Sequence, residues 1–273
     1  MTQVALITGA SRGIGRATAL AFAKAGYQVA ITARELDSSE KHKISASSYA
    51  SGSLRATEQM ITAQGGQALA LTMDLLSAES VDKAIKQVLA HFGAIDVVIN
   101  NAVYQGPDLN APLMALTPET LDKIARAYIA APVQISQAVL PAMLAKQNGC
   151  IINITSGAGE KDPPITAEQG GWGYAYGAGK AAVSRLSGII SREHGQQGIR
   201  AFTVNPGVVN TETLRATIGE QGIKGLGQAV AEPEVIANAL LWLAQDSAAD
   251  ALQYQTIQAQ KLARDLENSA ANQ

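Results

Sequence analysis

Cysteine, aromatic residues and charge are all scarce in this chain of 273 residues. The single cysteine, Cys150, cannot form an internal disulfide, which fits a reducing compartment. Charged residues make up only 16% of the chain, and 21 basic against 23 acidic side chains leave a formal charge of −2. Because nucleic-acid-binding surfaces are usually basic, this balance argues against a nucleic-acid partner. With few aromatics but 47% hydrophobic residues, we expect a core packed by alanine, valine, leucine and isoleucine, and we exclude general disorder.

Long apolar runs and metal-ligand clusters are also missing. No run approaches the roughly 20 residues of a membrane helix. Met1 leads directly into an apolar segment, without the basic start or cleavage site of a signal peptide. The three histidines, His42, His91 and His194, lie far apart with no metal-ligand spacing. We therefore expect a cytoplasmic protein with no metal and no membrane partner.

Short β-branched runs alternate with longer amphipathic stretches along the chain. The expected strands are nearly all apolar, as is typical of strands covered on both faces, and span residues 4–8, 29–32, 68–72, 97–99, 151–155 and 201–204. Helical patterns between them span residues 14–25, 56–64, 78–91, 119–147 and 178–196. This alternation predicts an α/β fold with a doubly wound, Rossmann-type parallel sheet and helices on both faces. Functional residues are then expected just after the strands.

One nucleotide-binding domain is expected over residues 1–256, followed by a C-terminal tail over 257–273 that forms a weak, fraying helix. Two segments interrupt the alternation and are predicted to be inserted loops. Residues 38–53 hold seven serines in sixteen positions, and residues 157–173 carry proline and glycine pairs. Residues 212–232, which contain four glycines, are expected to form a mobile lid over the substrate.

A glycine-rich segment follows the first expected strand and precedes a helix. Its glycines allow a tight turn and a close approach of the backbone to a phosphate, while the helix N-terminus supplies N–H groups and a partial positive charge. The spacing is GxxxGxG, so the common GxGxxG pattern does not match it. The segment predicts a pyrophosphate site, with an ordinary turn as the alternative, and its candidate residues are Gly9, Ser11, Arg12, Gly13, Ile14 and Gly15.

Three polar residues further along suggest proton transfer. Tyr176 and Lys180 lie four apart on an expected helix, so both side chains project from one face. A nearby ammonium favours the phenolate and lowers the pKa of a tyrosine, which makes it a usable acid and base. Ser156 follows a strand and can donate a hydrogen bond to the same substrate oxygen. The alternative is a chance surface pair. Tyr174 is not a rival candidate, because position 178 is not a lysine.

Five motifs in this order resemble the compact members of the short-chain dehydrogenase/reductase family over roughly residues 3–245. They are the segment Thr8–Gly15, Asn100-Asn101-Ala102, Ser156, the pair Tyr176 and Lys180, and Asn205-Pro206-Gly207. The resemblance implies transfer of a hydride between a nicotinamide and a carbonyl or alcohol substrate. It implies that Tyr176 is the acid/base, that Lys180 lowers the pKa of Tyr176 and holds the cofactor ribose, and that Ser156 orients the carbonyl.

The resemblance also implies further cofactor contacts. Asn100 and Ala102 would line the cofactor floor. Asp74, with Leu75 beside it, stands where the family binds the adenine, and a helix cap is the alternative for Asp74. The loop over the nicotinamide would be formed by Pro206, Gly207, Val209 and Thr211.

The cofactor is expected to be NADP(H) in preference to NAD(H). An acidic residue at the end of the second strand would bind the ribose hydroxyls and select NAD, but position 33 is Ala and Arg34 follows it. Arg12 is a second cation on the same side. Arginine binds phosphate in a bidentate manner, so two of them favour the 2′-phosphate. A solvated Arg34 is the alternative.

Two departures from the family pattern stand out. The family usually carries an asparagine in the fourth helix that kinks it and holds a water leading to the lysine, whereas Tyr128 stands there in this chain. This predicts a slower or differently wired proton relay. The gap from Ser156 to Tyr176 is also longer than usual, and Trp172 in the extra loop either stacks on a substrate or covers its own scaffold.

The prediction is therefore an NADP(H)-dependent oxidoreductase of a small carbonyl or alcohol substrate. A non-catalytic NADP(H)-binding sensor on the same fold is the alternative, supported by Tyr128 and opposed by the intact set of Ser156, Tyr176 and Lys180. Dehydration or epimerisation is a third possibility, for which the short stretch after Pro206 leaves little room. Relatives are usually dimers or tetramers, so we expect a homodimer or homotetramer built on residues 119–147 and 178–196.

Overall fold

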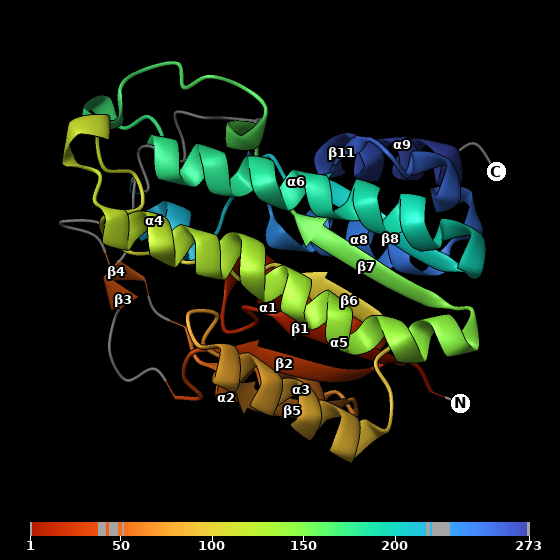
Figure 1. Ribbon diagram of the computed structural model, residues 1–273. Helices are drawn as coiled ribbons and strands as arrows, with labels where there is room; N and C mark the ends of the chain where they lie inside the picture. Colours follow the sequence, from red (N-terminus) through yellow and green to blue (C-terminus); the bar gives the residue numbers. More distant parts are fainter. Residues whose placement is uncertain are drawn as a thin grey trace.

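A parallel seven-stranded sheet runs through the centre of the molecule, with the order β11-β8-β7-β6-β1-β2-β5 (Figure 1). The structure is a computed structural model, and it describes residues 2–37, 42–43, 49–50, 52–216, 219 and 230–271. The strands of the sheet are β1 (Val4–Thr8), β2 (Gln28–Ala33), β5 (Gln67–Thr72), β6 (Val97–Asn100), β7 (Gly149–Ile154), β8 (Ile199–Asn205) and β11 (Thr256–Gln258). The prediction of a doubly wound parallel sheet is confirmed.

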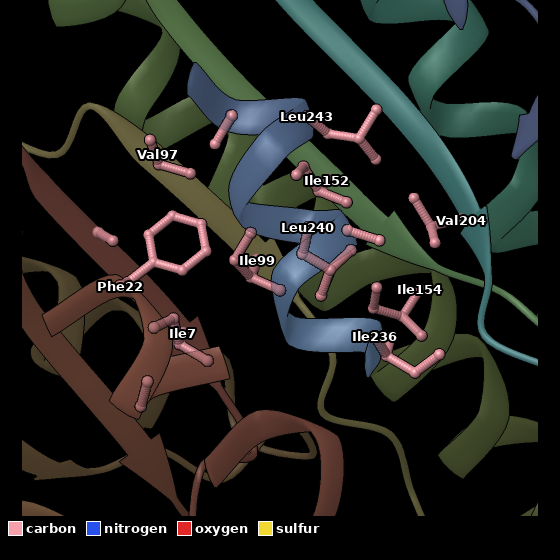
Figure 2. Close-up of a cluster of buried hydrophobic side chains, with 14 of the residues drawn as sticks. Ile7, Phe22, Val97, Ile99, Ile152, Ile154, Val204, Ile236, Leu240 and Leu243 are labelled. Carbon is pink, nitrogen blue, oxygen red and sulfur yellow. The ribbon is translucent and has the colours of Figure 1, made fainter. Parts of the chain in front are cut away.

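One face of the sheet is covered by α1 (Gly13–Lys24), α2 (Leu54–Ala63), α8 (Pro233–Gln245) and α9 (Ala259–Ala271). Figure 2 shows Phe22 of α1 and three side chains of α8 packed on the strands, with Ile7 and Ile99 beneath them. Successive residues of a strand point to opposite faces, so Ala5 and Ile7 of β1 belong to this layer. Their neighbours in β1 therefore have to be apolar as well, because they face the other layer.

The other face carries α3 (Ala78–Phe92), α4 (Pro118–Ile124), α5 (Ala131–Lys146) and α6 (Tyr174–His194). Val4 and Leu6 of β1 and Val98 of β6 point into this layer, where they meet Tyr128, Ile135 and Val183. Both faces of the central strands are thus dry, and all five residues of β1 are buried. This explains why the strands lack the alternation of polar and apolar residues that a half-exposed sheet shows.

The direction of winding reverses between β1 and β6. From β1 the chain proceeds outward through β2 and β5, and then returns to place β6 on the opposite side of β1. The carboxyl ends of neighbouring strands diverge at such a switch point and leave a crevice for a ligand. The glycine-rich segment after β1 and the Asn100–Ala102 segment after β6 therefore open into the same crevice.

The long helical stretch predicted over 119–147 is interrupted. A π-helical turn, η2 (Ala125–Ala130), separates α4 from α5. Pro132 follows the turn and has no N–H to donate to the carbonyl of Tyr128, so the regular ladder of α-helical bonds cannot continue there. The turn lies where the family pattern places a kink, and it carries Tyr128.

The whole stretch Pro118–Lys146 has the length and mean hydropathy of a membrane-crossing helix, and 44% of its most apolar window is buried within the protein. Its inner side packs on α3, α6 and β7. A core helix of a water-soluble protein has the same features, so this one helix is weak evidence for a membrane span. On its outer side Ile129 is 48% exposed, and Ile189 of α6 is 54% exposed. The expected oligomer would cover these two side chains, and that oligomer stays a prediction.

The C-terminal residues differ from the predicted tail. Ile257 lies in β11, which pairs with β8 at the edge of the sheet, and α9 packs on α8 with Ala259 and Ala263 buried. The boundary placed at residue 256 therefore cuts through the folded domain. A three-residue strand is too short to show a periodic pattern, and α8 was not expected because its apolar residues surround nearly the whole helix.

The inserted segments are described only in part. Of residues 38–53, the structure describes two short strands that pair with each other, β3 (His42–Lys43) and β4 (Tyr49–Ala50), and positions 52–53. Residues 157–173 connect β7 to α6 through two 3-10 turns, η3 (Gly157–Gly159) and η4 (Ala167–Gln169). Much of the expected lid, residues 217–218 and 220–229, lies outside the described residues.

Candidate active site

A cavity of about 530 Å³ opens at the carboxyl ends of the central strands. It runs from the glycine-rich segment at one end to Ser156 and Tyr176 at the other. The predicted site residues that line it are Gly9, Ser11, Arg12, Gly13, Ile14, Arg34, Asp74, Leu75, Ala102, Ser156, Tyr176, Lys180, Pro206, Gly207, Val209 and Thr211. Residues from seven separate parts of the chain thus meet in one elongated space.

Two predicted cofactor residues lie behind the wall of this cavity. Asn100 is 6% exposed, and its amide donates a 2.8 Å hydrogen bond to Asn153 of β7, so it ties two strands together. The next residue, Asn101, lines the cavity in its place. Gly15 is also absent from the lining, because it packs against Gly9 beneath the turn. Asn100 therefore does not line the cavity in this structure, and its contact with the cofactor stays a prediction.

The glycine-rich turn leaves no room for side chains at two positions. Gly9 adopts φ +72°, and a Cβ there would lie 2.9 Å from Cα of Ala102. A Cβ on Gly15 would lie 2.2 Å from the carbonyl oxygen of Gly9. Asn101 completes the turn by donating its amide to the carbonyls of Thr8 and Gly9 at 2.9 and 3.2 Å. The turn is thus fixed from below by β6.

We expect Gly15→Ala to destabilise the protein and abolish nucleotide binding. Backbone atoms cannot yield to a contact of 2.2 Å without moving the turn, and overpacking of this kind costs roughly 1–3 kcal/mol or more. Thermal unfolding and NADPH fluorescence titration measure the two effects. Gly188→Ala in α6 is the matched control, because its Cβ would meet nothing within 4 Å and should leave both quantities unchanged or slightly improved. Normal nucleotide binding by Gly15→Ala would refute this account of the turn.

The N-terminus of α1 already attracts an anionic group in this structure. The carboxylate of Glu212 accepts a 2.9 Å hydrogen bond from the N–H of Gly13 and also pairs with Arg16 at 2.9 Å. The helix has no acidic residue in its first turn and no side-chain cap of its own. The N–H groups of this turn therefore behave as the anion site that a pyrophosphate requires. Sequence reasoning missed Glu212, because nothing local signals that it crosses to α1.

Two arginines line the outer end of the cavity. The pKa of Arg12 is lowered, first by burial and then by the positive charges of Arg34 and Arg16, while Glu212 opposes the shift. Arg12 and Arg34 both line the cavity, Arg34 being exposed. Because the two positive charges repel each other, a negative charge bound beside both arginines would be stabilised. The residues present therefore fit a nucleotide that carries a phosphate at this end.

Ser156 and Tyr176 meet at the inner end. Ser156 follows β7, and its hydroxyl accepts a 3.3 Å hydrogen bond from the N–H of Ala158. Burial raises the pKa of the Tyr176 phenol, and a hydrogen bond from the Ser156 hydroxyl opposes this rise. Tyr176 lies in the first turn of α6, which directs its side chain back towards the strand ends. A proton donor and a hydroxyl are thus placed at one point of the cavity.

Lys180 lies one helical turn beyond Tyr176 and is 4% exposed. Its ammonium donates a 2.8 Å hydrogen bond to the carbonyl of Ile154. Burial lowers the pKa of Lys180 from 10.5 to about 7. Burial is the largest influence on the pKa of both groups, and the lowering of the pKa of Tyr176 by Lys180 stays a prediction.

Comparison with known proteins gives the same assignment as the motifs. The sequence profile described as "short chain dehydrogenase" matches residues 3–222. The 3-oxoacyl-[acyl-carrier-protein] reductase of Synechocystis sp. is 33% identical over 93% of this chain and 94% of its own. The chain belongs to the short-chain dehydrogenase family. It is therefore an oxidoreductase that acts on a keto or hydroxyl group.

Other similar proteins agree on the family. The 3-oxoacyl-[acyl-carrier-protein] reductase FabG of Staphylococcus epidermidis is 32% identical and is aligned over 91% of this chain and 93% of its own. A crystal structure of a metagenomic short-chain oxidoreductase in complex with NADP has a TM-score of 0.71 and 31% identity, covering 94% of this chain and 96% of the other. A 3-oxoacyl (acyl-carrier-protein) reductase from Agrobacterium tumefaciens with NADP bound has a TM-score of 0.76 and 28% identity, covering 94% and 92%.

Asp74 does not cap a helix in this short-chain dehydrogenase. Its carboxylate accepts a 3.0 Å hydrogen bond from the N–H of Leu76, and the cap of α3 is Ser77. Asp74 and Leu75 both line the cavity near its outer end. The helix-cap alternative is thereby removed, and contact with the adenine stays a prediction.

The substrate end has walls that the sequence reasoning did not name. Tyr104 and Leu109 follow β6, and Leu214 lies shortly after Thr211 along the chain. Their position after a strand indicated that this part of the chain would lie near the site, but no motif identified the individual residues. Trp172 is absent from the lining and lies beside Gly177, which favours its role as a cover for its own scaffold.

Other reactive groups of the described residues offer no competing site. Cys150 is buried in β7, and burial raises the pKa of its thiol to about 12, so it is not a nucleophile. Within the described part of the chain, no three His, Cys, Asp or Glu side chains gather into a metal site.

Proposed function

We propose that this protein transfers a hydride between NADP(H) and a carbonyl or alcohol substrate, with Tyr176 as the acid/base. The observation that carries the proposal is the shared cavity. It joins an anion-attracting turn and two arginines at one end to Ser156, Tyr176 and Lys180 at the other. A nucleotide that reaches from Arg34 along the turn would bring its nicotinamide to the tyrosine.

The nicotinamide supplies or accepts the hydride, and the protein handles the proton. In reduction, Ser156 donates a hydrogen bond to the carbonyl oxygen and Tyr176 delivers its phenolic proton to the same atom. Lys180, when protonated, stabilises the phenolate that results. Pro206, Gly207, Val209 and Thr211 line the same cavity and would cover the nicotinamide.

The C-terminal helix supports the loop that forms this cover. The side-chain amide of Gln260 in α9 donates to the carbonyls of Pro206 and Val208 at 3.0 and 2.9 Å. A Cβ on Gly207 would lie 2.6 Å from the same amide. Residues 257–273, which were expected to be a fraying tail, therefore contribute to the site.

The cofactor preference has a direct test. We expect NADPH to bind more tightly than NADH, and we expect Arg34→Ala to weaken NADPH binding about tenfold while leaving NADH unchanged, as removal of a charge-assisted hydrogen bond would do. Nicotinamide fluorescence titration measures both affinities. Arg264→Ala, an exposed arginine of α9, is the control. Tighter binding of NADH by the parent protein would contradict the proposal.

Two observations guide the search for a substrate. Apolar side chains such as Leu109 and Leu214 line the cavity that holds Tyr176, and the relatives named above are 3-oxoacyl-[acyl-carrier-protein] reductases. A 3-oxoacyl thioester such as acetoacetyl-coenzyme A is thus the first substrate to assay with NADPH, alongside a small neutral ketone. Absorbance at the nicotinamide band follows turnover. NADPH binding without turnover of any carbonyl would instead favour the non-catalytic sensor.

A further inference from the structure

A buried tyrosine lies between the catalytic lysine and the substrate wall. Tyr128 of η2 is 1% exposed and is among the largest fully buried side chains of the described residues. Its ring lies against α6 at Gly179, where a Cβ would come within 2.7 Å of Cδ1. The close approach of η2 to α6 at this point therefore depends on the glycine.

The ring of Tyr128 also faces the ammonium of Lys180. The nitrogen lies 5.7 Å from the ring centroid, within the range of a cation–π interaction. The same ammonium donates its hydrogen bond to the carbonyl of Ile154. Since Lys180 is buried, an aromatic face helps to keep its charged form in place.

The hydroxyl of Tyr128 reaches the opposite side of the site. It donates a 2.9 Å hydrogen bond to the backbone carbonyl of Tyr104, which lines the substrate end of the cavity. The phenol of Tyr104 is fixed in turn by a 2.5 Å hydrogen bond to Asp108, which also accepts from Thr120 at 2.8 Å. The Tyr104 segment is thus held at its backbone by Tyr128 and at its side chain by Asp108.

We propose that Tyr128 is a positioning residue with two separable tasks: its ring holds the ammonium of Lys180, and its hydroxyl fixes the Tyr104 wall that receives the substrate. The inference rests on the proposed function, because both tasks concern the same reaction. It assigns to one side chain the support of the proton-transfer group and of the substrate wall.

Removal of the hydroxyl alone tests the second task. We expect Tyr128→Phe to raise KM for the carbonyl substrate about fivefold, the factor that corresponds to one neutral hydrogen bond, with kcat and NADPH affinity close to those of the parent. Tyr27→Phe, which alters a buried tyrosine on the opposite face of the sheet, is the matched control and should leave KM unchanged. An unchanged KM in Tyr128→Phe would overturn the assignment.

Removal of the ring tests the first task through the pH dependence of carbonyl reduction, in which the ammonium of Lys180 stabilises the phenolate left on Tyr176. Burial already lowers the pKa of Lys180 to about 7, and without the ring its ammonium is less stable and loses its proton at lower pH. We therefore expect the midpoint at which the rate falls with rising pH to move down by at least 0.5 unit in Tyr128→Leu and to stay in place in Tyr128→Phe. The other titratable groups near these side chains are Tyr104, Asp108 and Lys123, and all three are retained in both variants.

Equal midpoints in Tyr128→Phe and Tyr128→Leu would overturn the role of the ring. If Tyr128→Leu fails to fold, Gly179→Ala provides a second displacement, because the added Cβ pushes the ring without altering Tyr128, and it should lower the midpoint in the same way. A parent protein that turns over no carbonyl would refute the proposed function instead, so the two failures are distinguishable.

Discussion

Tyr176→Phe should lower kcat for carbonyl reduction roughly a thousandfold, because the variant retains the ring but has no proton to deliver to the substrate oxygen. A positioned general acid contributes roughly a hundredfold to ten-thousandfold to a rate. NADPH affinity should change little, since the phenylalanine occupies the same volume beside the cofactor. Steady-state kinetics with NADPH and fluorescence titration measure the two quantities on the same preparation.

The control for this variant lies two residues away. Tyr174 is 62% exposed on the same helix, and Tyr174→Phe should keep parental activity. The comparison separates loss of the acid from a general effect of removing a phenol from the first turn of α6. Turnover by Tyr176→Phe above one tenth of the parental value would refute Tyr176 as the acid/base.

Lys180→Met should lower activity by roughly a hundredfold or more and at the same time stabilise the protein near pH 6. Activity falls because, in the proposed mechanism, the ammonium of Lys180 stabilises the phenolate of Tyr176. Stability rises because the folded protein buries an ammonium at a cost. Methionine fills a similar volume without a charge.

The pH dependence of this stability follows from the pKa of Lys180. Burial lowers that pKa to about 7, whereas the unfolded chain keeps its proton up to about pH 10.5. Between these values the unfolded state binds more protons, so the free energy of unfolding of the parent rises with pH across this window. Below about pH 7 both states are protonated and the full cost of burying the ammonium is present.

The stability difference between Lys180→Met and the parent should therefore be largest at pH 6 and shrink towards pH 10. We expect the Tm of the variant to lie roughly 5 °C above that of the parent at pH 6, measured by calorimetry at several pH values. Lys161→Met, an exposed lysine of the loop before α6, should show no such difference. A variant that is less stable than the parent at pH 6 would show that the hydrogen bond to Ile154 outweighs the burial cost.

The local pattern was enough to predict the sheet and the cradle. Short, wholly apolar runs such as residues 4–8 and 97–99 are typical of strands buried on both faces. Burial of both faces of a sheet requires a layer of helices on each side. Gly9 and Gly13 require a backbone with positive φ, so their place between a strand and a helix indicates a phosphate turn. Tyr176 and Lys180 were recognisable because their spacing places them on one face of a helix, and Ser156 was recognisable because it follows a strand.

Contacts between distant segments were beyond the reach of the sequence. Glu212 meets Gly13 across 199 residues, and Gln260 supports Pro206 across 54. Both are ordinary polar residues in their own surroundings, so no local pattern distinguishes them from a solvated side chain. The edge strand β11 is likewise too short to produce a periodic signal.

By itself, the sequence determined which reactive side chains are present and which of them share a helix face or follow a strand, because local geometry converts spacing along the chain into these positions. The tertiary structure alone decided what surrounds that chemistry. It placed Tyr128 between Lys180 and Tyr104. It also placed Asn101 in the cavity lining, with Asn100 behind it, and α9 against the loop that lines the site. The physical reason is that the burial and packing of a side chain depend on which helices and strands lie next to it. These neighbours are fixed only when the whole chain has folded.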